Sequence, residues 1–123
     1  MERSVIEVAR LTLDEKENIM QNQYITLAQG MTKRFPNGNE PYQIMTRLLE
    51  ECGEVAKEVN HFENSGTKAL RHGEPSKEKL AGEVKDVLNA LMQLVLYYNI
   101  EDELDEAVRK SIGQLREEGY ISK

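Results

Sequence analysis

Apolar residues recur every three or four positions along most of the chain, the spacing of one face of an α-helix. Four such segments can be drawn: from Thr12, a capping residue, to the turn at Phe35–Asn39; from Pro41 to Phe62; from the cap Ser76 to Tyr98; and from Glu101 to Glu118, with Gly119 as C-cap. No segment alternates as a β-strand does. The pattern predicts an all-α protomer, an antiparallel four-helix bundle-like unit.

The third segment is the most apolar, with no charged residue between Val87 and Ile100, so we expect it to be central. Residues 63–75 carry breakers and read as a loop with one helical turn near Lys68–Arg71. The expected inward stripes are Ile44, Leu48, Cys52, Val55, Val59 and Phe62 in the second segment, and Leu80, Val84, Val87, Leu88, Leu91, Leu94, Val95 and Tyr98 in the third.

Composition adds limits to this picture. The 123 residues suit one domain, and with no Trp and only 2 Phe its core is small, which favours completion by oligomerisation. The net charge of -6 and the lack of a basic stripe argue against a nucleic-acid polymer as partner. Residues 1–11 are charged and lack a signal-peptide core, and no run suits a membrane. The single cysteine, Cys52, points to a reducing compartment, so we expect a cytoplasmic protein.

Two acidic pairs carry the candidate chemistry. Glu51 and Glu54 share one side of the second segment, and Glu83 and Asp86 flank the apolar face of the third. Folding these segments antiparallel about their loop brings both pairs to one level, because the rise per residue is equal on both helices. Such a cluster needs a cation to offset its repulsion, and oxygen ligands favour Mg²⁺, with Mn²⁺ as a substitute. A metal held there could activate water against a phosphoric anhydride.

The pattern Glu50-Glu51-x-x-Glu54, then 28 residues, then Glu83-x-x-Asp86, resembles the MazG-like all-α nucleoside triphosphate pyrophosphohydrolases. The resemblance covers all four segments and implies one domain of this family over residues 1–123. The chain departs from many members in its long connection between the acidic pairs. It also has Gln21–Tyr24 where a Trp often lies near the base.

The resemblance implies cleavage between the α and β phosphates of a nucleoside triphosphate, which gives the monophosphate and pyrophosphate. The implied Mg²⁺ ligands are Glu51, Glu54, Glu83 and Asp86, while Glu50 serves a further metal or water activation, so that Glu50, Glu51 and Glu54 are the expected catalytic residues. Members assemble as homodimers or homotetramers and act on modified, surplus or deoxynucleotides.

Substrate contacts outside the metal site are expected from polar and basic residues near it. Asn89 extends the acidic stripe, and a polar amide on so apolar a helix needs a partner. Lysines can neutralise a triphosphate tail. The expected substrate-binding residues are Asn89, Lys79, Lys110 and Gln23, with Lys57 and Arg116 as further cations.

Three alternatives remain open. A di-iron carboxylate bundle needs two Glu-x-x-His motifs, and the chain has one, Glu58-x-x-His61. A non-catalytic helical interaction module would treat the acidic residues as solvated surface, as we expect for those that begin the fourth segment. Within the enzyme class, the substrate could be a specialised nucleotide such as phosphoribosyl-ATP. Cys52 is expected to serve packing.

Overall fold

The computed structural model of the chain describes residues 4, 10, 12–65 and 73–122, with the backbone alone over 13–22. Its helices are α2 (Leu13–Arg34), α3 (Pro41–Phe62), α5 (Lys77–Tyr98) and α6 (Glu101–Glu117), and no strand occurs among the described residues. The predicted all-α class and the four predicted segments are therefore confirmed. The helical turn expected near residues 68–71 lies outside the described residues.

The helix ends lie where the sequence predicts them, for local reasons. Pro41 opens α3, and the backbone N–H of Glu40 donates to Gln43 Oε1 over 3.1 Å. Ser76 caps α5, its hydroxyl accepting from the backbone N–H of Lys79 over 3.2 Å. Asn99 ends α5 with a left-handed φ of 53°. Gly119 follows α6 with φ 86°, a conformation open to glycine.

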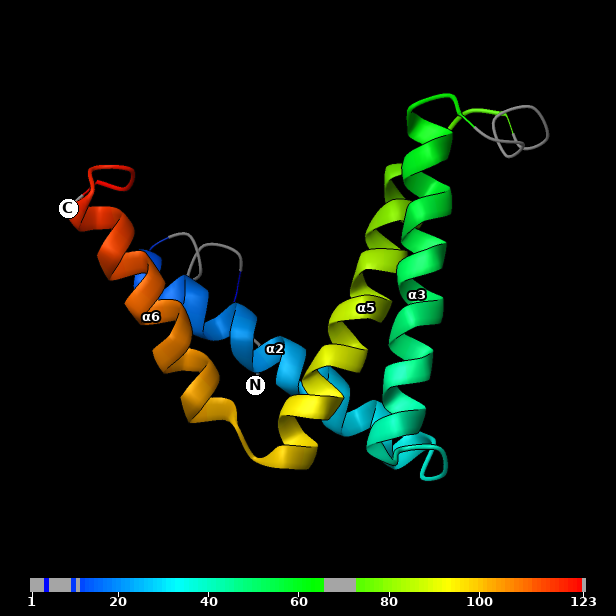
Figure 1. Cartoon of the computed structure of the whole chain (residues 1–123), viewed down its shortest axis with the longest axis horizontal. Helices are drawn as coiled ribbons and strands as arrows, with labels where there is room; N and C mark the ends of the chain where they lie inside the picture. Colours follow the sequence, from blue (N-terminus) through cyan, green and yellow to red (C-terminus); the bar gives the residue numbers. More distant parts are fainter. Residues whose placement is uncertain (1–3, 5–9, 11, 66–72, 123) are drawn as a thin grey trace.

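The helices form two arms, one made of α3 and α5 and the other of α2 and α6 (Figure 1). One arm is the pair α3 and α5, which run antiparallel and share the largest packed surface of the molecule. α2 crosses the lower part of α5, and α6 turns back from the end of α5 and contacts it only slightly. Within one chain the helices therefore do not close around a single core. None of these four helices is both long enough and apolar enough to cross a membrane.

The core of the described chain is small and partly polar. Its buried apolar side chains are Ala28, Ile44, Ala90 and Val95. Glu58, His61 and Gln93 are also buried, and His61 Nε2 forms a hydrogen bond with the carbonyl oxygen of Gly73. Polar residues are mostly exposed in proteins, so the hydrophobic pattern alone does not identify these three positions as buried.

The inward face predicted for α3 is partly wrong. Ile44 is buried, and Leu48, Val55 and Phe62 are half-buried, but Cys52 and Val59 are exposed. They belong to a second apolar stripe about a third of a turn around the helix. We call it the outer α3 stripe; its members are Tyr42, Met45, Leu49, Cys52, Ala56 and Val59.

The inward face predicted for α5 is also partly wrong. Val84, Leu91 and Tyr98 are exposed, whereas Ala90 and Gln93, which were not expected inside, are buried. The surface of α5 that packs against α3 is narrower than the surface formed by all the apolar residues of α5. Small or hydrogen-bonded side chains take the places where α2 and α3 meet this helix.

Candidate metal centre and adjoining cavity

Three carboxylates meet where the middles of α3 and α5 face each other. Glu51 of α3 and Glu83 and Asp86 of α5 each offer one oxygen, and these oxygens lie within 4.8 Å of one another. All three residues are half-buried. The antiparallel pairing predicted from the sequence thus brings these three residues together. We call them the carboxylate trio.

Burial and the neighbouring carboxylates both act on the carboxyl group of Glu51. Burial raises the pKa of its carboxyl above the usual 4.5, and the negative charges of Asp86, Glu83, Glu54 and Glu50 raise it further. The folded chain therefore holds a proton on Glu51 more tightly than the unfolded chain does. A divalent cation bound between the three oxygens would offset the part of this shift that comes from the neighbouring negative charges.

The other two predicted acidic residues lie at the rim. Glu54 does not join the trio; its Oε1 accepts from Lys57 Nζ over 3.1 Å on the exposed side of α3. Glu50 is exposed. Both act on Glu51 through their charge. Lys85, next in sequence to Asp86, pairs with it over 3.3 Å at the surface.

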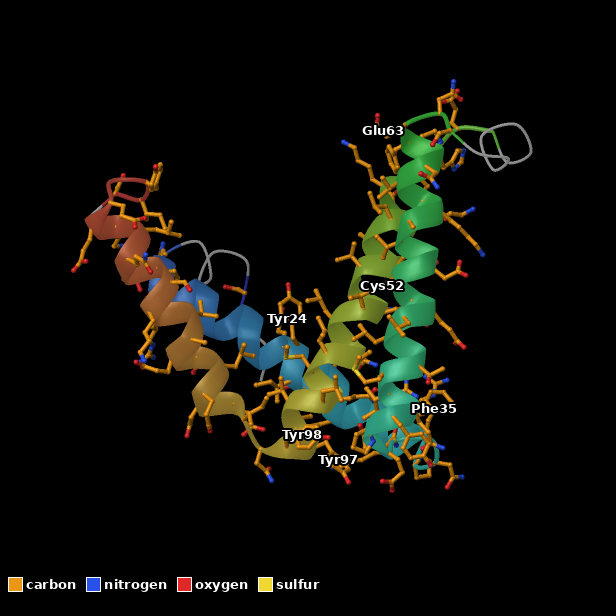
Figure 2. All side chains as sticks on the ribbon, viewed as in Figure 1. Tyr24, Phe35, Cys52, Glu63, Tyr97 and Tyr98 are labelled. Atoms are coloured by element: carbon orange, nitrogen blue, oxygen red, sulfur yellow. The ribbon has the colours of Figure 1, made fainter. Side chains whose placement is uncertain are left out.

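A cavity of about 280 Å³ opens beside the trio. Its lining includes Glu51 and Asp86 from the trio and, from the end of α2 and the turn that follows, Met31 and Phe35; Figure 2 shows Phe35 beside the first turns of α3. Asn89 lies in this lining, and among the described residues its buried Oδ1 has no hydrogen-bond partner. The complete lining is Met31, Phe35, Asn39, Arg47, Glu51, Asp86, Asn89 and Gln93.

The cation in this cavity is one that sequence reasoning missed. Arg47 lies four residues before Glu51, a spacing that places both on one face of α3. That spacing was the available signal, although an Arg and a Glu four apart on a helix are usually a surface ion pair. Here Arg47 is half-buried and lines the cavity.

Three of the predicted substrate contacts are not among the cavity residues. Lys79 and Gln23 are exposed and line neither described cavity. Lys110 is exposed on α6, which lies on the other arm, apart from α3 (Figure 1). Of the four predicted contacts, the structure places Asn89 beside the trio.

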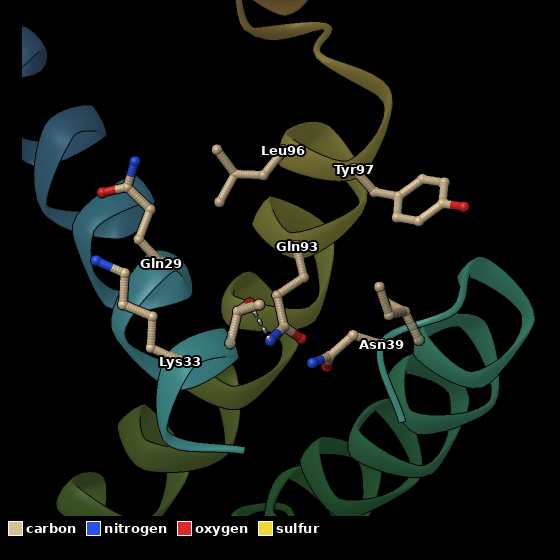
Figure 3. A pocket seen from close by; sticks show the side chains of 8 residues that line it. Gln29, Lys33, Asn39, Gln93, Leu96 and Tyr97 are labelled. Atoms are coloured by element: carbon tan, nitrogen blue, oxygen red, sulfur yellow. Dashed lines mark hydrogen bonds between the residues drawn. The ribbon is translucent and has the colours of Figure 1, made fainter. Parts of the chain in front are cut away.

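A second cavity, of about 330 Å³, lies behind Gln93 between α2 and the end of α5 (Figure 3). Gln29 and Lys33 approach it from α2, Leu96 and Tyr97 from α5, and Asn39 from the turn. Gln93 and Asn39 line both cavities. The second cavity has no carboxylate in its described lining, so the metal chemistry belongs to the first.

Comparison of the chain with protein-family models, curated proteins and solved structures gives no match.

The raised pKa of Glu51 predicts how stability depends on pH in the absence of metal. A carboxyl whose pKa is higher in the folded than in the unfolded state favours folding below 4.5, and this contribution is lost as pH rises through the folded-state pKa. We expect the free energy of unfolding, measured by urea denaturation in EDTA, to fall as the pH rises from 4.5 through the folded-state pKa of Glu51.

Glu51→Gln should make this fall in the free energy of unfolding smaller and should raise the melting temperature at neutral pH by a few degrees. Glu63→Gln, an exposed control, should leave the profile unchanged; equal profiles for all three proteins would contradict the repulsion.

Proposed function

We propose that the chain hydrolyses a nucleoside triphosphate between its α and β phosphates in the presence of Mg²⁺, releasing pyrophosphate. The observation that carries the proposal is the carboxylate trio, of which Glu51 and Asp86 line a cavity that is also lined by the guanidinium of Arg47 and the amide of Asn89. The position of cleavage rests on the likeness of the acidic motifs to the MazG-like family.

The trio fits a hard divalent cation. Three carboxylate oxygens from two helices converge at a half-buried point, and burial together with the charges of the neighbouring carboxylates raises the pKa of Glu51. Oxygen donors suit Mg²⁺, which commonly keeps several waters and shares them with a phosphate, and Mn²⁺ accepts the same ligands. When bound, the cation would supply an activated water and neutralise charge that develops on the phosphoryl group.

The rim carboxylates suit the handling of that water. Glu54 pairs with Lys57 at the rim, and its charge still acts on Glu51. We assign Glu54 and Glu50 to accepting the proton of the attacking water, with Glu54 as a further metal ligand. Asn89, with its unpartnered Oδ1 in the cavity, is assigned to a donor group of the substrate or to a metal-bound water.

The proposal is tested by incubating the purified chain with standard and modified nucleoside triphosphates and Mg²⁺. Pyrophosphate and phosphate are then separated as products. Release of pyrophosphate and monophosphate, restored by Mn²⁺ and abolished by EDTA, is the expected result. Release of phosphate would move the cleavage site. No turnover of any nucleotide, together with no Mg²⁺ binding by calorimetry, would favour the non-catalytic interaction module, for which the outer α3 stripe offers a surface.

We also propose a homo-oligomer. The described helices do not close around a single core, and this leaves large apolar side chains of α3 exposed. The outer α3 stripe has the 3-4 spacing of helices that pack together, and Leu49 in it is 67% exposed. A second copy would offer the same stripe, as a two-fold interface requires. Cys52 lies in this stripe as an exposed free thiol, which suits a reducing cytoplasm.

Leu49→Lys is therefore expected to shift the protein to single chains, because it places a charge in the apolar interface. Sedimentation equilibrium measures the mass directly. Gln114→Lys adds the same charge on exposed α6, away from this stripe, and should leave the mass unchanged. A wild-type mass of one chain at all concentrations would contradict the oligomer.

A further inference from the structure

Arg47 makes hydrogen bonds within the fold, although its spacing from Glu51 is typical of a surface ion pair. Its Nη2 donates to Gln93 Oε1 over 2.6 Å, and its Nη1 donates to the carbonyl of Gly38 over 3.2 Å. Gln93 is only 6% exposed, and its own Nε2 donates to Thr32 Oγ1 over 3.1 Å. The chain Thr32–Gln93–Arg47–Gly38 thus joins α2, α5, α3 and the turn, and it fixes the guanidinium in the cavity wall.

These contacts do not use all the N–H donors of the Arg47 guanidinium. It carries five N–H donors, and the contacts to Gly38 and Gln93 occupy two of them. Both acceptors are uncharged, so among its described contacts no carboxylate neutralises Arg47. A charged donor in a cavity wall, with part of its hydrogen-bonding capacity open, is suited to binding an acceptor atom of a ligand.

The place of Arg47 in the cavity indicates which part of the ligand it meets. Glu51 lies one helical turn further along α3, about 6 Å, so the metal and the phosphates belong to the acidic end. The cavity, at about 280 Å³, is at the small end of ligand pockets and leaves room for one nucleoside unit. Its lining also includes Phe35 and Met31, which offer apolar surface to a flat ring.

We propose that Arg47 is a specificity-determining residue that donates to a carbonyl oxygen on the edge of the nucleobase, with Gln93 and Gly38 as its positioning residues. The inference rests on the proposed function in that it takes the metal-bound phosphate as the anchor of the nucleotide. A guanidinium donates and cannot accept, so it favours an oxo group over an amino group at the same ring position.

The test uses nucleoside monophosphates and Mg²⁺ in isothermal titration calorimetry, so it needs no turnover. Two matched pairs differ at the relevant position: UMP against CMP, and IMP against AMP. We expect the wild-type chain to bind the oxo member of at least one pair about tenfold more tightly, the size of one hydrogen bond to a charged group.

Arg47→Met should abolish this preference. Arg47→Lys keeps the charge but loses the fork held by Gly38 and Gln93, so it should abolish the preference as well. Gln93→Leu should reduce it, because Arg47 then loses one of its two anchors. Arg109→Lys, on exposed α6, is the matched control and should leave it unchanged. The affinity for pyrophosphate should be the same in all five proteins, and circular dichroism checks their folding.

The inference would be overturned if no monophosphate binds the wild-type chain, if the wild-type chain shows no oxo preference, or if the Arg47 variants retain that preference. Equal weakening of all four monophosphates and of pyrophosphate would also overturn it and make Arg47 a phosphate ligand. The proposed function fails separately, by the absence of pyrophosphate release from triphosphates while the base preference of the monophosphates persists.

Discussion

Replacing Glu51, Glu83 or Asp86 with alanine is expected to reduce Mg²⁺-dependent pyrophosphate release by on the order of 10³-fold. Each residue contributes one oxygen to the carboxylate trio, so the loss of any one leaves an incomplete ligand set. The cation would then be held weakly and misplaced relative to the phosphates. Stability should not suffer, since each substitution removes a negative charge from a repulsive group.

Three measurements separate a metal role from a structural one. Circular dichroism should give the wild-type helical signal, calorimetry should give weakened Mg²⁺ binding, and the turnover assay should give the loss. Glu103→Ala, in the exposed first turn of α6, removes the same group away from the trio and should keep full activity. Glu54→Ala tests the rim: a loss as large as that of Glu83→Ala would make Glu54 an essential ligand. Full activity in any trio variant would refute the metal assignment.

The sequence predicted the helices well because their ends depend on local chemistry. Ser76, Asn99 and Gly119 act within one turn of the backbone, and each sits at the helix end expected for its residue type. Side-chain burial is less local. α3 has apolar residues on two sides, and its sequence cannot tell which side meets α5 and which is left outside. Cys52 was placed inward for this reason and is exposed.

The residues of the candidate site likewise fall into those that could be predicted from the sequence and those that could not. Glu51, Glu83 and Asp86 could be brought together from the sequence because an antiparallel pair of straight helices fixes their level. Arg47 could not, because its environment depends on Gln93 of α5 and on the turn at Gly38. Lys79 and Lys110 were predicted to contact the substrate because they are positively charged. Charge alone does not show whether a side chain faces a cavity.

Ile44→Ala is expected to lower the free energy of unfolding by about 2–5 kcal/mol. Ile44 is 1% exposed and is the largest fully buried side chain in the described structure. Truncation removes apolar contacts and enlarges the cavity behind Gln93, which Ile44 lines. Because a small domain has a total stability of roughly 5–15 kcal/mol, this one side chain should account for a large share of it.

Met45→Ala is the matched control, since it is the next residue on α3 and is 42% exposed. Urea denaturation at a series of protein concentrations compares the two variants. The loss at Ile44 should not depend on concentration, because its contacts lie within one chain. Met45 lies in the outer α3 stripe, so Met45→Ala should lower the free energy of unfolding only slightly in the dilute protein. This loss should grow with concentration if a second copy covers the stripe, since association stabilises the folded chain by mass action.

Equal losses of unfolding free energy for both variants in the dilute protein would mean that Ile44 does not lie on the buried side of α3. The α3–α5 packing described above would then be wrong.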